Sequence, residues 1–314
     1  MSAGARPLSV GIVGFGKIAR AEHLPAIAAS ESFAVLCVAD TAPGDGSLPH
    51  YPDVERMLSA RDTPDAVVVC TPPQFRCRIA RHALERGTHV LLEKPPGVTV
   101  EEVEDLERLA KQKGLVLFCA WHSQFAPGVR PAREWLAPRA LRRVRIDWRE
   151  DVRVWHPKQR WIWETGGFGV FDPGINALSI AVRILPEPLT LNDAVLRFPA
   201  NCSTPIGAAL RFADPAGADI TATFEWLHTG SEQWSIEVET SDGLLLLSEG
   251  GSRLAIENDD VQLEPSAEYP AIYRHFAELI ATRRSDVDLR PLRLAADALA
   301  HGRHEAAPPF LESN

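Results

Sequence analysis

The chain has 314 residues, of which 45% are hydrophobic and 24% charged, a composition typical of globular proteins and a length that allows two hydrophobic cores. Its 33 basic and 42 acidic residues give a net charge of −9, and no run of Lys or Arg forms the basic stripe that a nucleic-acid backbone requires. No apolar stretch reaches the roughly 18 residues of a transmembrane helix. Neither nucleic acid nor a membrane is therefore expected as a partner.

The N-terminus and the cysteines favour a cytoplasmic location. Residues 1–7 lead directly into a short predicted strand and do not form the apolar core of a signal peptide. The five cysteines are an odd number, are scattered, and contain no C-x-x-C pair. We expect them to be reduced thiols.

Strands alternate with helices through the first 120 residues. Apolar runs predict strands at residues 8–13, 33–39, 66–71, 89–92 and 116–120, and helical periodicity predicts helices at residues 17–30, 74–85 and 100–113. The second crossover, residues 41–47, is rich in Pro and Gly and is predicted to be a loop. This alternation predicts a Rossmann domain with a doubly wound parallel sheet.

The first strand is followed at once by the pattern G-x-G-x-x-A, which begins at Gly14 and opens a helix. In a dinucleotide-binding turn the first glycine allows the sharp bend and the second allows close approach of a pyrophosphate. The backbone of Gly14, Gly16, Lys17 and Ile18 is therefore expected to bind a dinucleotide. The alternative is a structural turn that binds no phosphate.

Asp40 follows the second predicted strand, where an acidic side chain can accept a hydrogen bond from the ribose 2′-hydroxyl. The same carboxylate would repel a 2′-phosphate, and Thr41 stands where an arginine would hold that phosphate. NAD is therefore expected to be preferred, with NADP as the alternative if Arg20 or another base compensates. Asp40 could also simply cap the following loop.

After about residue 125 the pattern changes to the polar and apolar alternation of an antiparallel sheet. Strands are predicted at residues 144–149, 194–198, 208–212, 220–226, 234–240 and 244–248, with one helix at residues 172–185. Two late helices, residues 269–283 and 291–303, are not placed by the sequence, which leaves open that they pack back on the first domain. The expected domains are a Rossmann domain, residues 1–122, and an α+β domain with a mainly antiparallel open sheet, residues 123–314.

Three motifs of the first domain carry a resemblance: the glycine turn, the turn Thr71-Pro72-Pro73, and the element Glu93-Lys94-Pro95. Together they resemble the Gfo/Idh/MocA family of NAD(P)-dependent sugar and cyclitol oxidoreductases. The resemblance implies that Lys94 faces the nicotinamide and the reacting carbon, and that Thr71, Pro72 and Glu93 line the cofactor site. The alternatives are a structural Thr-Pro-Pro turn and a surface lysine.

The second half of the chain contains Trp155-His156-Pro157, Trp161-Ile162-Trp163 and the segment from Gly169 to Ile180. These segments resemble the aldose 1-dehydrogenases of that family, which implies D-galactose and L-arabinose as substrates. Many family members have a histidine four residues after the aspartate, where this chain has Asn176, and Arg76 stands where another histidine is common. Asp172 and Asn176 share one helix face, so both can touch one ligand. Asp172 is expected to take the hydroxyl proton and Asn176 to fix a sugar oxygen. Asp172 could instead be the N-cap before Pro173.

A sugar pocket combines aromatic faces with hydrogen-bonding groups. The candidate substrate-binding residues are His122, Glu150, Trp155, His156 and Trp234. For each tryptophan a core position is the alternative. No metal site is expected, because His122 and His156 lack a third ligand at a recognisable spacing and hydride transfer to a nicotinamide needs no metal.

Three further expectations concern the whole protein. The substrate could be another sugar or a polyol such as an inositol. A protein of a different class, a non-catalytic NAD-binding sensor or regulator, would keep the same fold. Finally, the sheet of the second domain is expected to have an exposed apolar face, and the family resemblance implies that such a face pairs two subunits in a homodimer.

Overall fold

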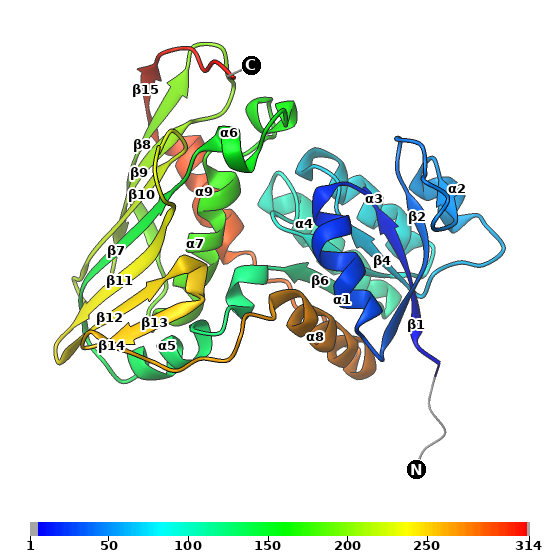
Figure 1. Ribbon diagram of the computed structural model, residues 1–314, viewed down its shortest axis with the longest axis horizontal. Helices are drawn as coiled ribbons and strands as arrows, with labels where there is room; N and C mark the ends of the chain where they lie inside the picture. The colour runs from blue at the N-terminus through cyan, green and yellow to red at the C-terminus, as the bar shows by residue number, and fades with distance from the viewer. Residues whose placement is uncertain (1–5, 313–314) are drawn as a thin grey trace. The chain divides into compact units, whose positions relative to one another are not determined.

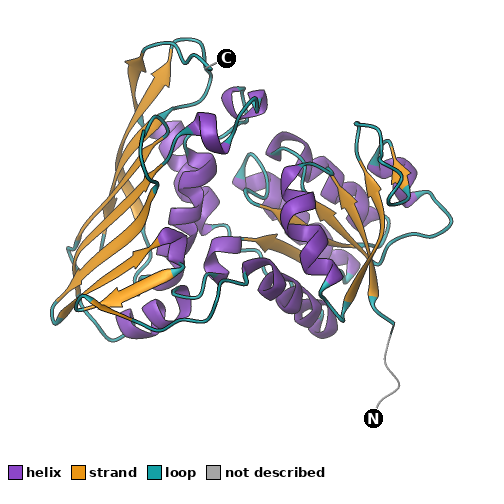
Figure 2. Cartoon of the chain, in the orientation of Figure 1, coloured by secondary structure: helices purple, strands orange, loops and turns teal. Residues whose placement is uncertain are grey.

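The computed structural model describes residues 6–312, which form two compact units (Figures 1 and 2). The first unit runs up to His122 and includes Tyr269–Leu289, and the second comprises Ser123–Glu268 and the chain from Arg290 onward. Residues 1–5, on which the expectation about a signal segment partly depends, lie outside the described residues. Within the described part of the chain, no helix is long and apolar enough to cross a membrane.

The first unit contains one parallel sheet in the order β3-β2-β1-β4-β5-β6. Its strands are β1 (Leu8–Val13), β2 (Phe33–Ala39), β3 (His50–Tyr51), β4 (Ala66–Val69), β5 (His89–Glu93) and β6 (Leu117–Ala120). Its helices are η1 (Ala19–His23), α1 (Leu24–Ala28), α2 (Val54–Leu58), α3 (Pro73–Glu85), α4 (Val100–Lys113) and α8 (Glu268–Thr282). The strand order reverses between β1 and β4, as in a doubly wound fold, which confirms the predicted Rossmann sheet.

The strands of this sheet are buried because helices cover both faces. All four residues of β4 are 0% exposed, as the continuous apolar run Ala66–Val69 predicts for a central parallel strand. Right-handed crossovers in opposite directions from β1 and β4 place α1 on one face and α3 and α4 on the other. Residues 41–47 form a loop, as predicted. Between this loop and β4 the chain also holds β3 and the short helix α2, whose first turn is capped by Asp53, and both are too short to stand out from the sequence.

The second unit contains a nine-stranded mixed sheet in the order β14-β13-β12-β11-β7-β10-β9-β8-β15. Its strands are β7 (Leu141–Arg149), β8 (Thr190–Pro199), β9 (Gly207–Ala213), β10 (Asp219–Glu225), β11 (Gln233–Thr240), β12 (Gly243–Ser248), β13 (Arg253–Ile256), β14 (Asp259–Asp260) and β15 (Arg303–Ala307). Its helices are η2 (His122–Phe125, which begins in the first unit), α5 (Val129–Leu136), α6 (Val152–Trp155), η3 (Arg160–Trp163), α7 (Phe171–Ile184), η4 (Glu249–Gly251) and α9 (Arg290–His301). Only β7–β10 and β8–β15 are parallel pairs, so the sheet is mainly antiparallel, as predicted.

One face of this sheet is covered by helices (Figure 2). Helix α7 contacts β7 and β11, while α9 contacts β8 and α5 contacts β12. The approach of α7 to β10 is close, because a Cβ on Gly174 would lie 2.6 Å from the ring of Phe224. Alternate side chains of the strands, such as Val144, Ile146 and Ile236, are buried beneath these helices. The core therefore follows the period of two that the sequence shows.

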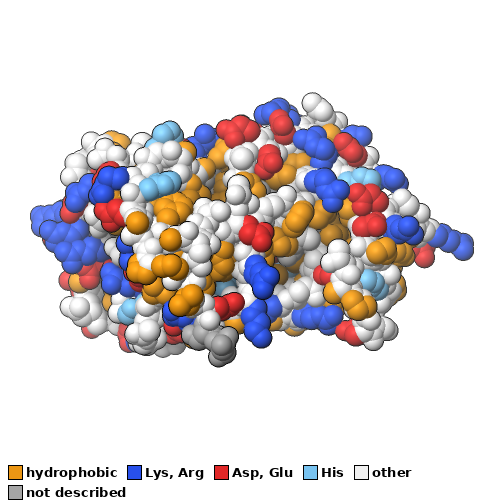
Figure 3. Space-filling model, turned by 90° about the horizontal axis from the view of Figure 1, so that it is seen from above, with side chains coloured by type: hydrophobic (Ala, Val, Ile, Leu, Met, Phe, Trp, Pro, Cys, Tyr) orange, Lys and Arg blue, Asp and Glu red, His pale blue; other side chains and the backbone are white. Residues whose placement is uncertain are grey.

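The expectation of an apolar outer face on this sheet is wrong. The side chains of β7 that alternate with the buried ones are Arg143, Arg145, Asp147 and Arg149, and none of them is buried. Arg143 lies opposite Glu239 of β11, with a nitrogen-to-oxygen distance of 3.2 Å. Opposite charges on neighbouring strands favour each other. In another view of the molecule, from above relative to Figure 1, basic, acidic and apolar side chains are interspersed (Figure 3).

Candidate functional site

The glycine turn has the geometry that a dinucleotide needs. Gly14 has φ +86°, and a Cβ there would lie 2.7 Å from the backbone nitrogen of Thr71, so only glycine fits. At Gly16 a Cβ would meet nothing within 4 Å. The space above the second glycine is therefore open at the N-terminal end of the following helix, where Lys17 is exposed. These residues fit a pyrophosphate.

Asp40 lies directly beside this turn. Its Oδ2 accepts a hydrogen bond of 2.6 Å from the backbone N–H of Phe15, and its Oδ1 accepts one of 2.8 Å from Ala42. Because a carboxylate oxygen can accept two hydrogen bonds, both oxygens keep a lone pair for a further donor such as a ribose hydroxyl. Asp40 therefore caps the loop, the alternative that the sequence left open, and keeps the capacity to bind a ribose.

The turn after β4, at Thr71 and Pro72, is a second place that can contact a ligand. Thr71 and Pro72 are half-buried, and within the described residues the Oγ1 atom of Thr71 is buried without a hydrogen-bond partner. An unpaired buried hydroxyl is costly unless a ligand or water completes it. The backbone of this turn is fixed by Arg76, which is 5% exposed and donates to the carbonyl of Thr71 at 2.7 Å.

Arg76 also holds the segment that carries Lys94. Its guanidinium donates to the carbonyl of Glu93 at 2.7 Å and to that of Pro95. Lys94 itself is half-buried between buried neighbours, at the carboxyl end of β5. The carboxyl ends of parallel strands are the edge at which open α/β sheets bind ligands. Arg76, noted in the sequence only as a departure from the family pattern, thus takes a defined structural role.

The carboxylate of Glu93 fixes the backbone of Lys94 from the inside of the sheet. Its Oε2 accepts the Lys94 N–H at 2.9 Å, and its Oε1 accepts hydrogen bonds of 2.9 Å from His23 and from Tyr269. Glu93 is 2% exposed and His23 is 0% exposed. Glu93 therefore acts inside the domain, beneath Lys94.

Burial disfavours the charged forms of Glu93 and His23, but interactions with neighbouring side chains outweigh its effect on both pKa values. Burial by itself would raise the pKa of Glu93, but the hydrogen bond and the charge of His23 lower that pKa to about 2. Burial would lower the pKa of His23, but interactions with Cys70, Tyr273 and Glu93 raise it well above 6.5. A buried imidazolium and a buried carboxylate therefore face each other.

Two tyrosines of α8, Tyr269 and Tyr273, complete this cluster. Neither tyrosine was predicted as a site residue from the sequence, and nor was His23. Tyr273 lies 2.8 Å from Nδ1 of His23, and the ring of Tyr269 stacks on His122 with a centroid distance of 5.7 Å. His122, a predicted substrate-binding residue, is thus placed near the Lys94 segment of the first unit. Tyr269 and Tyr273 are four residues apart on one helix face, a signal that the sequence contained.

In the second unit, Asp172 and Asn176 lie in the first turns of α7. The helix begins at Phe171 with Val170 as its N-cap, so Asp172 is not the N-cap residue. Asp172 is 5% exposed, and Asn176 is the only residue between 171 and 182 that is not buried. Both side chains share one helix face, as the spacing predicted.

Glu150 lies in the same unit and orients two indole rings. Its Oε1 accepts a hydrogen bond of 3.2 Å from Trp226, and its Oε2 accepts one of 3.0 Å from Trp234. Glu150 is 3% exposed and Trp226 is 0% exposed. Trp226 was not predicted as part of the site, because nothing in the sequence distinguishes it from a core tryptophan. Glu150 thus fixes the ring of Trp234.

His156 and Trp155 join this group at its edge. Nε2 of His156 lies 3.5 Å from Glu150 and 3.8 Å from Asp172, so the imidazole is placed between two carboxylates. The rings of Trp155 and Trp234 meet edge to face at 5.0 Å, and Trp155 donates to Glu232 at 3.2 Å. Trp155 is 36% exposed, which leaves part of its ring free for a ligand.

The structure thus sorts the predicted residues into two groups, one in each unit. The first contains the glycine turn, Asp40, the Thr71 turn, the Lys94 segment and His122, and the second contains Asp172, Asn176, Glu150, Trp155, His156 and Trp234. Among the described residues, no group of three or more His, Cys, Asp or Glu side chains is placed to hold a metal ion.

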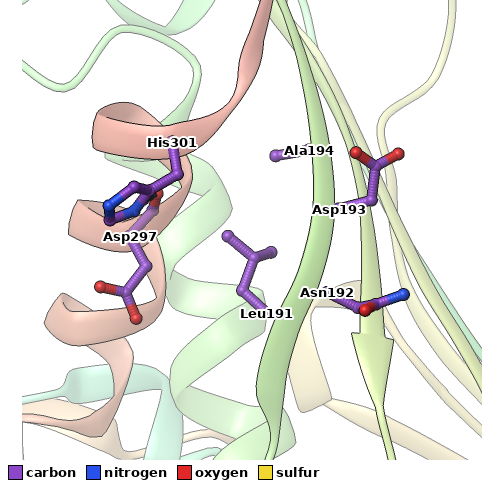
Figure 4. Close-up of a pocket in the computed structure, with 6 residues that line it drawn as sticks. All are labelled: Leu191, Asn192, Asp193, Ala194, Asp297 and His301. Atoms are coloured by element: carbon purple, nitrogen blue, oxygen red, sulfur yellow. Dashed lines mark hydrogen bonds between the residues drawn. The ribbon is translucent and has the colours of Figure 1, made fainter.

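A cavity of about 320 Å³ lies elsewhere in the second unit, between β8 and α9. Figure 4 shows Leu191 and Ala194 of β8 turned toward Asp297 and His301 of α9. None of the predicted site residues lines this cavity. It therefore adds nothing to the candidate site.

A doubly wound sheet with an open glycine turn is typical of the dinucleotide-binding oxidoreductases. Residues 8–120 match the family model of the oxidoreductase family with an NAD-binding Rossmann fold. The galactose 1-dehydrogenase of Pseudomonas fluorescens is 41% identical over 307 residues, which cover 98% of this chain and 100% of the relative. The chain therefore belongs to the Gfo/Idh/MocA family of oxidoreductases.

Solved structures agree with this assignment. The crystal structure of a D-galactose-1-dehydrogenase protein from Rhizobium etli is 46% identical and has a TM-score of 0.94, covering 99% of this chain and 100% of that chain. A 3-ketoreductase from Actinomadura kijaniata, crystallised with NADP and TDP-benzene, has a TM-score of 0.83 at 20% identity and covers 96% of this chain and 100% of that chain. The second likeness concerns the fold alone.

Proposed function

We propose that the chain is a galactose 1-dehydrogenase, which oxidises the anomeric carbon of D-galactose to the lactone with NAD(P) as the hydride acceptor. The observation that carries this proposal is the 41% identity to a galactose 1-dehydrogenase along 98% of the chain. The likeness extends through both units, so it includes the residues of the second unit that would select the sugar as well as the nucleotide fold. Fold alone would not support a substrate.

The chemistry requires that C1 lose a hydride and that its hydroxyl lose a proton. A bound nicotinamide would supply the hydride acceptor. In the proposal, the ammonium of Lys94 hydrogen-bonds the C1 oxygen and stabilises the negative charge that develops on it. Asp172 takes the hydroxyl proton, directly or through Lys94, and the amide of Asn176 fixes a ring or C1 oxygen. Asparagine is not a base near neutral pH, so Asn176 can only orient.

Recognition of the sugar is assigned to the aromatic and acidic group of the second unit. The exposed part of Trp155 and the ring of Trp234 offer apolar faces for the C–H groups of a pyranose. His156, and also His122 of the first unit, can exchange hydrogen bonds with sugar hydroxyls. Glu150, whose oxygens already accept two indole N–H groups, would contribute to binding chiefly through Trp234.

L-Arabinose is the second substrate that we propose. As pyranoses the two sugars share the configuration of C1 to C4, and arabinose lacks only the hydroxymethyl group. A single missing group of this size changes selectivity by about 1–3 kcal/mol, so overlap follows. An inositol or another polyol, and a non-catalytic NAD-binding sensor, are the alternatives that the experiment below separates.

For the cofactor we propose a preference for NAD, with NADP as a second acceptor. Asp40 supports the preference, because both of its oxygens can accept a ribose hydroxyl while its charge repels a 2′-phosphate.

We also propose that the protein is cytoplasmic and forms a homodimer. Because the outer face of the second sheet is charged and not apolar, this charged face is the surface to test for dimerisation.

The test follows NADH or NADPH absorbance with the purified chain and D-galactose, L-arabinose, D-glucose or myo-inositol. Turnover of the first two sugars is expected, with a Lys94→Met variant as the inactive control. Turnover of inositol alone would refute the substrate. Nucleotide binding without turnover of any sugar would favour the sensor.

A further inference from the structure

Arg20 and Asp40 both form hydrogen bonds with the backbone of Phe15, a residue of the glycine turn. The backbone N–H of Phe15 donates to Asp40 at 2.6 Å, and its carbonyl accepts from Nε of Arg20 at 3.1 Å. The guanidinium also lies over the Phe15 ring, 4.1 Å from its centroid. A cation and an anion therefore flank one residue of the turn. The charge of Arg20 is thus held beside the carboxylate assigned to the ribose.

Asp45 competes for this cation. One terminal nitrogen of Arg20 donates to Oδ2 of Asp45 at 2.9 Å, while Oδ1 of Asp45 accepts hydrogen bonds from the backbone and hydroxyl of Ser47. These hydrogen bonds and the charge of Arg20 hold the pKa of Asp45 well below its usual range, so the carboxylate is ionised at any physiological pH. The two side chains are 47% and 49% exposed, so a ligand can reach the pair.

The chemistry of this pair suits a phosphate monoester. A 2′-phosphate on a ribose at Asp40 would meet a planar guanidinium with several N–H donors, the group that binds phosphate best. Lys17, the other exposed cation of the turn, follows Gly16 directly and is better placed for the pyrophosphate. An exposed ion pair such as Arg20–Asp45 is weak, so a dianion can displace Asp45 from Arg20.

We infer that Arg20 is the 2′-phosphate-binding residue of this chain and that Asp45 sets the ratio of NAD to NADP by competing for it. The inference rests on the nucleotide binding of the proposed function and on no property of the sugar. Removing Asp45 frees Arg20 and strengthens NADP binding alone. Removing Arg20 weakens NADP binding more than NAD binding, because NAD carries no 2′-phosphate.

The experiment measures the dissociation constants of NADH and NADPH for the full chain by fluorescence titration at low ionic strength, without sugar. Arg20→Gln is expected to weaken NADPH binding by about ten- to a hundredfold, the effect of a lost charge-assisted hydrogen bond. NADH binding is expected to weaken by a much smaller factor, through the lost hydrogen bond to the carbonyl of Phe15. Asp45→Asn is expected to strengthen NADPH binding by about two- to fivefold. Asp105→Asn removes a similarly exposed, Arg-paired carboxylate on α4 and should change neither constant.

Several results would overturn the inference. An equal loss of NADH and NADPH binding in Arg20→Gln would make Arg20 a support of the turn, and an unchanged ratio in Asp45→Asn would remove the competition. A selective loss of NADPH binding in Lys17→Ala with none in Arg20→Gln would move the phosphate to Lys17. If the unmodified chain binds neither nucleotide, the proposed function itself fails, whereas normal NADH binding with unaltered ratios refutes only this inference.

Discussion

Replacing Glu93 by Gln removes the charge that faces His23 and keeps the size of the side chain. The pKa of Glu93 is about 2 in the folded protein and its usual value is 4.5, a difference that corresponds to about 3 kcal/mol of stability. Breaking a buried ion pair costs about 3–5 kcal/mol, because the remaining charge loses its partner. We therefore expect Glu93→Gln to lose about 3 kcal/mol of unfolding free energy near pH 6.

The pH dependence of this loss follows from the two shifts. The lowered pKa of Glu93 contributes stability above about pH 4.5, and this contribution disappears as the pH falls toward 2. The raised pKa of His23 contributes stability that is complete below 6.5 and is lost as the pH rises through its folded value. The difference between Glu93→Gln and the unmodified chain should thus be largest near pH 5–6 and decrease toward alkaline pH, where His23 can become neutral.

The assay is urea unfolding followed by circular dichroism and by tryptophan fluorescence at several pH values. Seven of the eight tryptophans lie in the second unit and only Trp121 lies in the first, so a change in circular dichroism without matching fluorescence reports the first unit. Glu239→Gln is the control, because its pair with Arg143 is about half exposed and should contribute less than about 1 kcal/mol. The reasoning is refuted if Glu93→Gln costs no more than Glu239→Gln, or if its cost does not vary with pH.

Three further outcomes are expected. Gly14→Ala should destabilise the chain by about 1–3 kcal/mol in thermal unfolding, because the φ of Gly14 is +86° and the added Cβ would lie 2.7 Å from the backbone nitrogen of Thr71. Gly16→Ala, whose Cβ meets nothing within 4 Å, should keep the melting temperature of the unmodified chain but lose affinity for NADH in titration. Equal melting temperatures for the two variants would contradict this prediction. Trp234→Phe should raise the KM for galactose more than it lowers kcat, because the smaller phenyl ring keeps an aromatic face but loses the hydrogen bond to Glu150 that orients the indole. An unchanged KM would exclude the ring from the sugar site. Asp172→Asn should lower kcat by about 10²–10⁴-fold at an unchanged dissociation constant for NADH, and near-normal turnover would remove Asp172 from catalysis.

The parts of the fold that the sequence predicted are those set by local patterns. Each strand from β1 to β6 except β3 is mostly apolar, and the glycine turn and Asp40 lie at strand ends whose positions follow from the same apolar runs. The cluster around Glu93 could not be predicted in this way. Its partners His23 and Tyr269 are 70 and 176 residues away, and only the folded chain brings them together.

The error about the outer face of the second sheet had a different cause. In the sequence of β7, charged residues alternate with apolar ones: Arg143, Arg145 and Asp147 with Val144 and Ile146. This alternation predicts that one face of the strand is charged and the other apolar. The expectation came from the family resemblance and did not follow the residues. Where a local pattern and an analogy disagree, the pattern carries the physical reason, because a one-residue offset in a strand reverses the face of the side chain.

Glu93 and Glu150 show why buried carboxylates occur in both units. Each uses both oxygens to accept hydrogen bonds, Glu93 from Lys94, His23 and Tyr269, and Glu150 from two indole N–H groups. A glutamine offers only one acceptor oxygen, and its NH₂ group would face a donor, so neither position can be filled by an amide without leaving a buried N–H unpaired. The cost of burying the charge is offset by these donors. Glu93 fixes the backbone of Lys94, whose ammonium is proposed to bind the C1 oxygen, and Glu150 fixes the ring of Trp234, which is proposed to contact a face of the sugar.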